Sequence, residues 1–201
     1  MKKFFFLVLI ICFTFPVWCQ DKPAKTGGAG LGLIYSTDFS GNMEVSGPIT
    51  ESFPVIFNNI GIFAYGDFVY VELIGALFYG LDSKRYLNFL GSDLGIYGKF
   101  PFVLSPAINL FPMLGFEFQA ALFGFFSSSH FEKRHFVWRQ FWFKGGAGLD
   151  YKINERIHLR FEALYGIRLK SGSDNTTLNG LNLILNDSIG HGLTIRIGIG
   201  V

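Results

Sequence analysis

The chain has 201 residues, of which 50% are hydrophobic and only 16% are charged, and it contains 25 Phe and 25 Gly. Soluble domains carry about 25% charged residues, so this composition disfavours an ordinary soluble protein. A formal net charge of +2 provides no general attraction to nucleic acid, and we predict no nucleic-acid partner.

The first residues have the pattern of a secretory signal, because Lys2 and Lys3 precede an apolar run from Phe4 to Val17. We predict a signal peptide over residues 1–19, cut after Cys19. Bulky Trp18 argues against lipidation of that cysteine. Both cysteines of the chain lie in this leader, so we expect no disulfide and no thiolate metal site beyond it.

Beyond the leader, hydrophobic residues alternate with polar or small ones. No apolar run there reaches the roughly 18 residues that a membrane helix needs. The clearest case is the segment from His191 to Val201, where Leu193, Ile195 and Ile197 share one face and Thr194, Arg196 and Gly198 the other. Side chains alternate with period two along a strand, so this pattern predicts β-structure.

Seven further segments alternate in the same way. The eight predicted strands cover residues 28–37, 55–65, 68–80, 93–102, 110–123, 139–152, 156–169 and 191–201. Long loops are expected at 39–54, 81–91, 124–138 and 170–190, the last with a short extension around Leu181 to Leu185. Short turns are expected at Gly66-Asp67, between Pro101 and Pro106, and at Asn154-Glu155.

These segments predict one all-β domain, an eight-stranded antiparallel up-and-down transmembrane β-barrel. Only helices and closed barrels satisfy every backbone group within a bilayer. We expect Leu159, Phe161, Ala163, Ile195 and Ile197 to face lipid. A secreted lipocalin-like barrel is the alternative; it would turn the apolar face inward, so the burial of these residues distinguishes the two.

The order of signal, alternating strands, short turns and terminal strand resembles the small eight-stranded outer-membrane barrels, such as the OmpA transmembrane domain. The resemblance implies the outer membrane of a diderm bacterium, with residues 20–27 as a periplasmic lead-in and 28–201 as the barrel. It implies extracellular long loops, periplasmic termini, monomeric insertion by the barrel-insertion machinery, and contact with outer-membrane lipids. The chain departs from many such barrels by ending on Val201 instead of an aromatic residue.

Ionisable residues on the predicted inward faces are the strongest candidate site. Six of them lie at similar depths and are expected to meet in the lumen: Glu72, Lys99, Glu117, Arg160, Glu162 and Arg196. Buried charges are costly unless they are paired, which favours a network of ion pairs that fills a narrow interior. A polar channel or a proton-sensitive gate is the functional alternative.

The third long loop combines aromatic and cationic residues. His130, Lys133, Arg134 and Trp138 could contact an anionic glycolipid or another extracellular ligand. The same residues suit an aromatic girdle at the membrane boundary, with the cations near lipid phosphates. His130 and His135 are five residues apart, which matches no metal-binding spacing, and we predict neither a metal nor a cofactor.

We expect a non-enzymatic barrel whose surface loops have a structural or interaction role. One alternative is an outer-leaflet lipid-modifying enzyme that would use Ser127 to Ser129 with His130, although no carboxylate is evidently placed to orient the imidazole. A small pore is the other alternative.

Overall fold

The structure is a computed structural model that describes residues 27–46, 51–82, 87–126, 139–169, 175–178, 181–186 and 190–201. The predicted signal peptide, the lead-in up to residue 26 and the third predicted loop from 127 to 138 lie outside the described residues.

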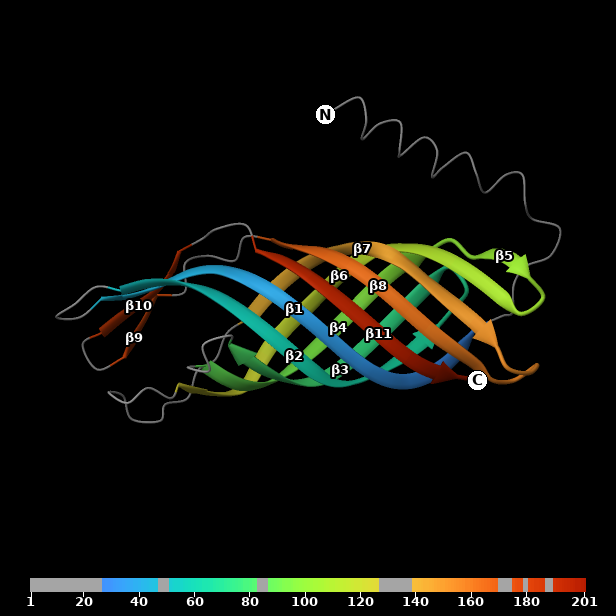
Figure 1. The fold of residues 1–201 in the computed structure, drawn as a ribbon, viewed down its shortest axis with the longest axis horizontal. Coiled ribbons are helices and arrows are strands. Elements are labelled where there is room, and N and C mark those ends of the chain that lie inside the picture. The colour runs from blue at the N-terminus through green and yellow to red at the C-terminus, as the bar shows by residue number, and fades with distance from the viewer. Residues whose placement is uncertain are drawn as a thin grey trace, which may run out of the picture.

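Eight strands form the wall of a closed antiparallel barrel, which confirms the predicted fold class (Figure 1). Neighbouring wall strands pair in chain order, and β11 closes the barrel by pairing with β1 from Gly200 opposite Gly30 to His191 opposite Phe39. The wall strands are β1 (Gly28–Ser46), β2 (Glu51–Asp67), β3 (Val71–Asp82), β4 (Leu87–Lys99), β6 (Ile108–Phe126), β7 (Arg139–Lys152), β8 (His158–Leu169) and β11 (His191–Gly200).

The apolar face of the wall is turned outward. Leu193, Ile195 and Ile197 are 44%, 41% and 49% exposed, whereas Thr194 and Arg196 between them are fully buried. The same alternation runs along β3 and β8. A lipocalin-like barrel would bury the three aliphatic residues, so this alternative is wrong. No part of the chain that the structure describes is a helix long and apolar enough to cross a membrane.

The outward apolar band has the height of a bilayer core. On β8 the outward side chains run from Leu159 to Leu169, and all are apolar or aromatic. Ten residues of strand extend about 33 Å, and a tilt of about 40° reduces that to about 25 Å along the barrel axis. Transmembrane barrels have an outward apolar band of about 25 Å. The described wall is therefore that of a membrane-spanning barrel.

Two predicted loops are shorter than the sequence indicated. Residues 39–54 were expected to form a loop, but β1 continues to Ser46 and β2 begins at Glu51. Residues 81–91 were expected to form a second loop, yet β3 reaches Asp82 and β4 starts at Leu87. Gly, Asn and Pro suggested a loop in the first segment, and polar residues suggested one in the second. Pairing with the neighbouring strand keeps the backbone extended there despite those residues.

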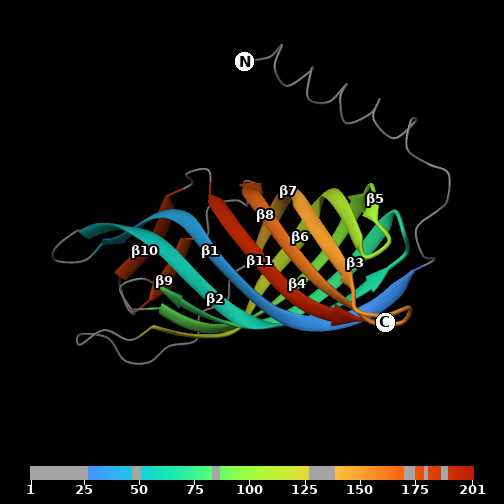
Figure 2. The ribbon, with the colours of Figure 1, turned by 45° about the vertical axis from the view of Figure 1, so that its right-hand side comes forward.

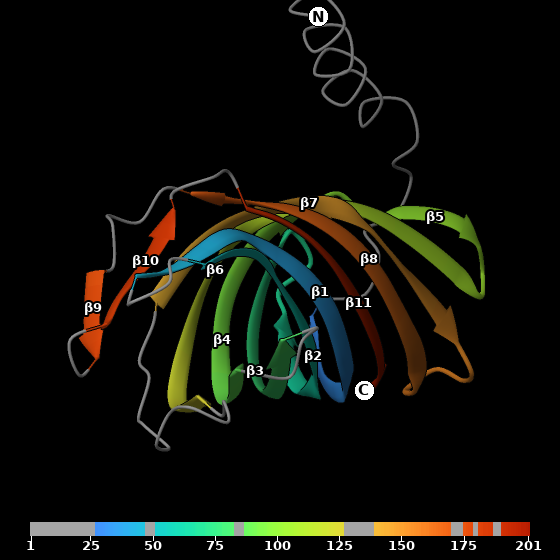
Figure 3. The same ribbon diagram turned by 60° about the vertical axis from the view of Figure 1, so that its left-hand side comes forward.

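The predicted extension in the fourth loop is present and has a pairing partner. β9 (Asn175–Leu178) and β10 (Leu181–Asn186) form a hairpin, and β10 pairs with residues 42–46 of β1. These parts of β1 and β2, with β9 and β10, make a four-stranded sheet at one end of the barrel, as two further views show (Figure 2, Figure 3). We call this end the outer end.

The first short turn is displaced by a few residues from its predicted position. The third strand was expected to start at Phe68, but residues 68–70 form the turn and β3 starts at Val71. The carboxylate of Asp67 accepts a hydrogen bond of 2.9 Å from the backbone nitrogen of Val69, which has a φ of 69°. This local bond stabilises a turn over residues 68–70, which follows the predicted Gly66-Asp67 turn in the chain.

The start of β1, the end of β11 and the short connections lie together at the other end of the barrel. Ala29 and Val201 exchange two backbone hydrogen bonds of 3.2 and 2.9 Å, and Gly28 lies opposite Asp67. The second short connection is more than a turn, because β5 (Phe102–Ser105) pairs with the start of β6. We call this end the short-turn end.

Candidate functional site: the charged interior of the barrel

The part of the interior nearest the short-turn end, which we call the lower layer, is organised around Arg160. This side chain of β8 is fully buried. Its guanidinium donates to both carboxylate oxygens of Asp150 on β7, at 2.7 and 2.8 Å, and to Asp67 on β2 at 2.7 Å. It also donates to Glu72 on β3 at 2.5 Å. In the closed strand order, β3 lies half-way around the wall from β8, so this bond crosses the lumen.

A second cation shares the same acids. Lys99 on β4 forms ion pairs with Asp67 and, at 3.2 Å, with Glu72. The guanidinium carbon of Arg160 lies 4.1 Å from the ring centre of Tyr65 and 4.8 Å from that of Phe111, and the Lys99 ammonium lies 4.7 Å from Phe111. Aromatic faces attract cations, so the two rings support this layer as well as fill space.

The next part of the interior toward the outer end, which we call the middle layer, is organised around Glu117 on β6. It forms ion pairs with Arg196 of β11 and Lys144 of β7, and it accepts a hydrogen bond from the hydroxyl of Tyr97. Arg196 also pairs with Glu162, its direct register partner on β8, at 3.2 Å. Glu162 in turn lies 3.9 Å from Arg160, so the lower and middle layers are connected.

Uncharged amides and an aromatic cluster fill the interior toward the outer end. The indole nitrogen of Trp142 donates to Gln119 and Gln140 at 3.2 Å each. Asn59 donates to Ser36 at 2.9 Å and to Asp38 at 2.6 Å. Farther out, three buried phenylalanines meet edge to face with ring centres 5.1 and 5.8 Å apart: Phe57, Phe78 and Phe89.

Inward glycines make room for these large side chains. A Cβ on Gly148 would overlap the ring of Phe111, and one on Gly80 would overlap the ring of Phe89. A Cβ on Gly91 would likewise overlap Phe78. Each ring therefore lies directly against the backbone of another strand, where only glycine leaves room for it.

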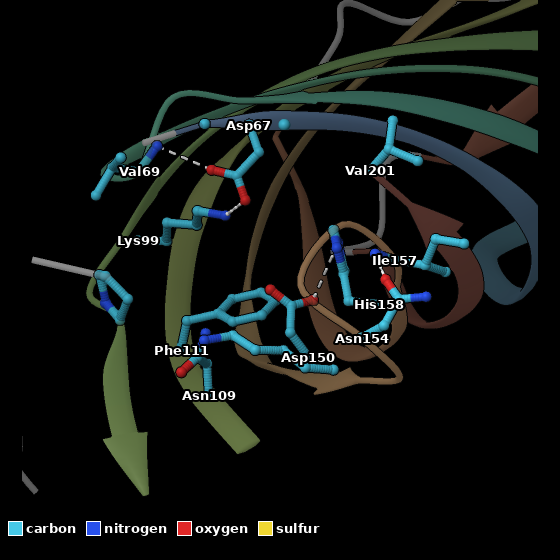
Figure 4. A pocket seen from close by; sticks show the side chains of 14 residues that line it. Asp67, Val69, Lys99, Asn109, Phe111, Asp150, Asn154, Ile157, His158 and Val201 are labelled. Carbon is cyan, nitrogen blue, oxygen red and sulfur yellow. Dashed lines mark hydrogen bonds and ion pairs between the residues drawn. The ribbon is translucent and has the colours of Figure 1, made fainter. Parts of the chain in front are cut away.

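The lower layer borders a small pocket at the short-turn end (Figure 4). His158 lines it, 2.9 Å from the hydroxyl of Tyr65 and 3.8 Å from Asp150. Other residues around it include Asp67, Lys99, Phe111, Ile157 and Val201. Figure 4 shows Asp67 pointing toward Lys99 and Asp150 toward His158, so two pairs of polar side chains line the pocket.

The structure brings the six predicted lumen residues together in these two layers. Three buried or half-buried partners were absent from the predicted set: Asp67, Lys144 and Asp150. Asp67 looked like a turn residue, while the alternation did place Lys144 and Asp150 on the inward face of β7. Their ionisable side chains on that face were the signal that could have added them.

The surface-loop candidates His130, Lys133, Arg134 and Trp138 lie outside the described residues, as do Ser127 to Ser129. Within the described ranges, no group of three or more His, Cys, Asp or Glu residues could hold a metal ion.

No family model and no curated protein matches the sequence. Among solved structures, Neisserial surface protein A is similar at 10% identity and a TM-score of 0.49, over 87% of this chain and 98% of that one. Ail, the attachment invasion locus protein of Yersinia pestis, is similar at 14% identity and a TM-score of 0.37, over 88% of this chain and 98% of that one.

A third similar structure is the outer-membrane protease OmpT from Escherichia coli, at 11% identity and a TM-score of 0.35, over 87% of this chain and 95% of that one. At these identities the similarity concerns the fold alone. The strand pairing of this chain itself establishes a closed eight-stranded antiparallel barrel with an apolar outer face, the architecture that the sequence predicted.

Proposed function

We propose that the protein is a non-enzymatic outer-membrane barrel with a closed lumen, which anchors the segments at its outer end in the membrane. The observation that carries the proposal is the bond between Arg160 and Glu72, which joins opposite walls through the centre of the barrel. An open pore leaves its lumen to water, whereas both of these side chains are fully buried.

The energetics of the interior also favour a closed state. Moving a charged side chain out of its layer would separate buried ion pairs, and losing one partner of such a pair costs about 3–5 kcal/mol. Arg160 and Arg196 each contact at least two carboxylates from different strands. A path for solute would require several of these contacts to break together.

The outer end supports an anchoring role. The sheet made by the ends of β1 and β2 with β9 and β10 extends past the part of β1 that pairs with β11. Together with the connections at that end, it would form the surface that the cell presents. We propose that this end is extracellular and that the termini and short turns face the periplasm, as in barrels with short periplasmic turns.

The orientation is tested with an epitope tag in the connection between β8 and β9. On intact cells that make the full chain, we expect antibody to label this tag, and a tag in the 153–157 turn to be labelled only after the outer membrane is permeabilised. The reverse pattern would invert the orientation, and label in neither case on folded protein would place the barrel in another compartment.

A further inference from the structure

Polar side chains form a patch on the lipid-facing wall at the outer end. On β11, the outward residues below His191 are all aliphatic, from Leu193 to Ile199. His191 itself is exposed and points outward. Thr37 of β1, the strand next to β11, and Asn58 of β2, one strand farther, are paired in register and also face outward. The register places Thr37 opposite Leu193, next to His191 along β11.

A tyrosine fixes the imidazole of His191. The hydroxyl of Tyr165 lies 2.6 Å from Nδ1 of His191, and the two rings stack with centres 6.0 Å apart. When the tyrosine donates this hydrogen bond, Nδ1 is the acceptor and the ring proton is on Nε2. A neutral His191 then presents an N–H on the side away from Tyr165, and a protonated ring presents the same N–H with a positive charge.

Asn58 is fixed in the same way. The hydroxyl of Tyr35 donates to Oδ1 of Asn58 at 3.0 Å, which leaves the two N–H groups of the amide for another acceptor. The hydroxyl of Thr37 lies between the amide and the imidazole in the register of the strands. We call the three groups, His191, Thr37 and Asn58, the outer-rim donor patch.

The patch has the chemistry of a phosphate site. It offers N–H and O–H donors, and none of the described outward side chains beside it on β8, β11, β1 and β2 is a carboxylate. Asn58 and Thr37 are register neighbours, about 5 Å apart, and Thr37 and His191 are diagonal neighbours, about 7–8 Å apart. The patch is therefore about the size of a lipid headgroup. Below it, Leu193 and Ile195 continue as an apolar wall that an acyl chain would cover.

We propose that the outer-rim donor patch binds the phosphate of an anionic membrane lipid, with the acyl chains lying along β11 and β1. A soluble phosphate would gain the same hydrogen bonds but no contact with the apolar wall. The inference rests on the membrane-spanning fold and is independent of whether the lumen conducts.

The test uses the mature full chain folded in mixed micelles with equal amounts of phosphatidic acid and phosphatidylcholine, followed by native mass spectrometry of the protein with its retained lipid. We expect the unmodified protein to retain phosphatidic acid about tenfold more than phosphatidylcholine. The His191→Ala/Asn58→Ala variant should lose this preference, because hydrogen bonds to a charged group have been removed. Tyr151→Phe, an exposed tyrosine near the short-turn end, should keep it.

A gel-mobility shift on heating verifies that each variant is folded, and Asn58→Ala alone gives the same comparison if the double variant fails to fold. Equal retention of the two lipids by the unmodified protein would overturn the proposal, as would a preference unchanged in the variants. Displacement of the lipid by millimolar inorganic phosphate would overturn the lipid assignment in favour of a general phosphate site.

Discussion

Glycine positions decide how the aromatic side chains of the interior are packed, and β3 offers a matched pair of glycines. A Cβ on Gly80 would overlap the ring of Phe89, whereas one on Gly75 would lie 3.8 Å from Leu94, an ordinary contact. We therefore expect Gly80→Ala to lower the free energy of unfolding by about 1–3 kcal/mol, the usual cost of overpacking. Gly75→Ala should change it much less. Urea unfolding in lipid vesicles measures both.

The cause of the Gly80→Ala effect can be separated from strand propensity. Phe89→Leu removes the ring that the new methyl group would meet. If overlap is the cause, the double variant Gly80→Ala/Phe89→Leu should be less destabilised than the sum of the two single variants. Strict additivity would mean that the ring and the glycine do not constrain one another.

Arg196 tests the energetic role of the ion-pair layers. Its removal in Arg196→Ala leaves Glu117 and Glu162 buried with one fewer cation, so we expect a loss of about 3–5 kcal/mol in the free energy of unfolding. Arg139 is the matched control, since it is an exposed arginine of β7. A similar loss in Arg139→Ala would show that the effect does not come from the buried pairs.

At the scale of the strand, the outward face of β8 is expected to meet hydrocarbon. Phe161 is 43% exposed in the middle of that face. Phe161→Arg should cost about 2–4 kcal/mol and impair assembly, because a charge near the bilayer midplane is unfavourable. Val103 is 56% exposed but lies on β5 at the short-turn end, so Val103→Arg should be tolerated. Heat-modifiability of the purified barrels measures assembly, and equal effects would contradict the assigned facing.

The β9–β10 hairpin is expected to be dispensable for the barrel. β10 pairs with residues 42–46 of β1, whereas β11 closes the wall on residues 30–39 of the same strand. Replacing residues 175–186 with a short Gly/Ser linker should therefore preserve the heat-dependent gel shift. Loss of the shift would mean that the outer sheet is needed to close the wall.

At the scale of the whole molecule, local alternation was enough to predict the wall. The patterns in 156–169 and 191–201 gave both the strands and their facing, because period two assigns every second residue to one side. The approach of Arg196 to Glu162 also follows from the antiparallel pairing of these two strands. Such contacts lie between neighbours in the strand order, which the sequence indicates.

The individual contacts across the lumen could not be derived in this way. The sequence placed Arg160 and Glu72 at similar depths, but it did not show which acid each cation would touch. Arg160 meets Glu72 because the sheet closes and brings β8 opposite β3. The long end of β1 and the first residues of β2 were also missed. Gly41 and Asn42 in β1 resemble turn residues, and pairing with β2 and β10 overrides that local preference.

Single-channel recording in a planar bilayer tests whether paired side chains close the barrel. The unmodified protein should show no steady openings, because Arg160 joins opposite walls. Arg160→Ala should produce openings if it still folds, whereas Arg156→Ala, which alters an exposed arginine in the turn before β8, should not. Steady conductance by the unmodified protein, unchanged in Arg160→Ala, would contradict the closed lumen and favour a pore.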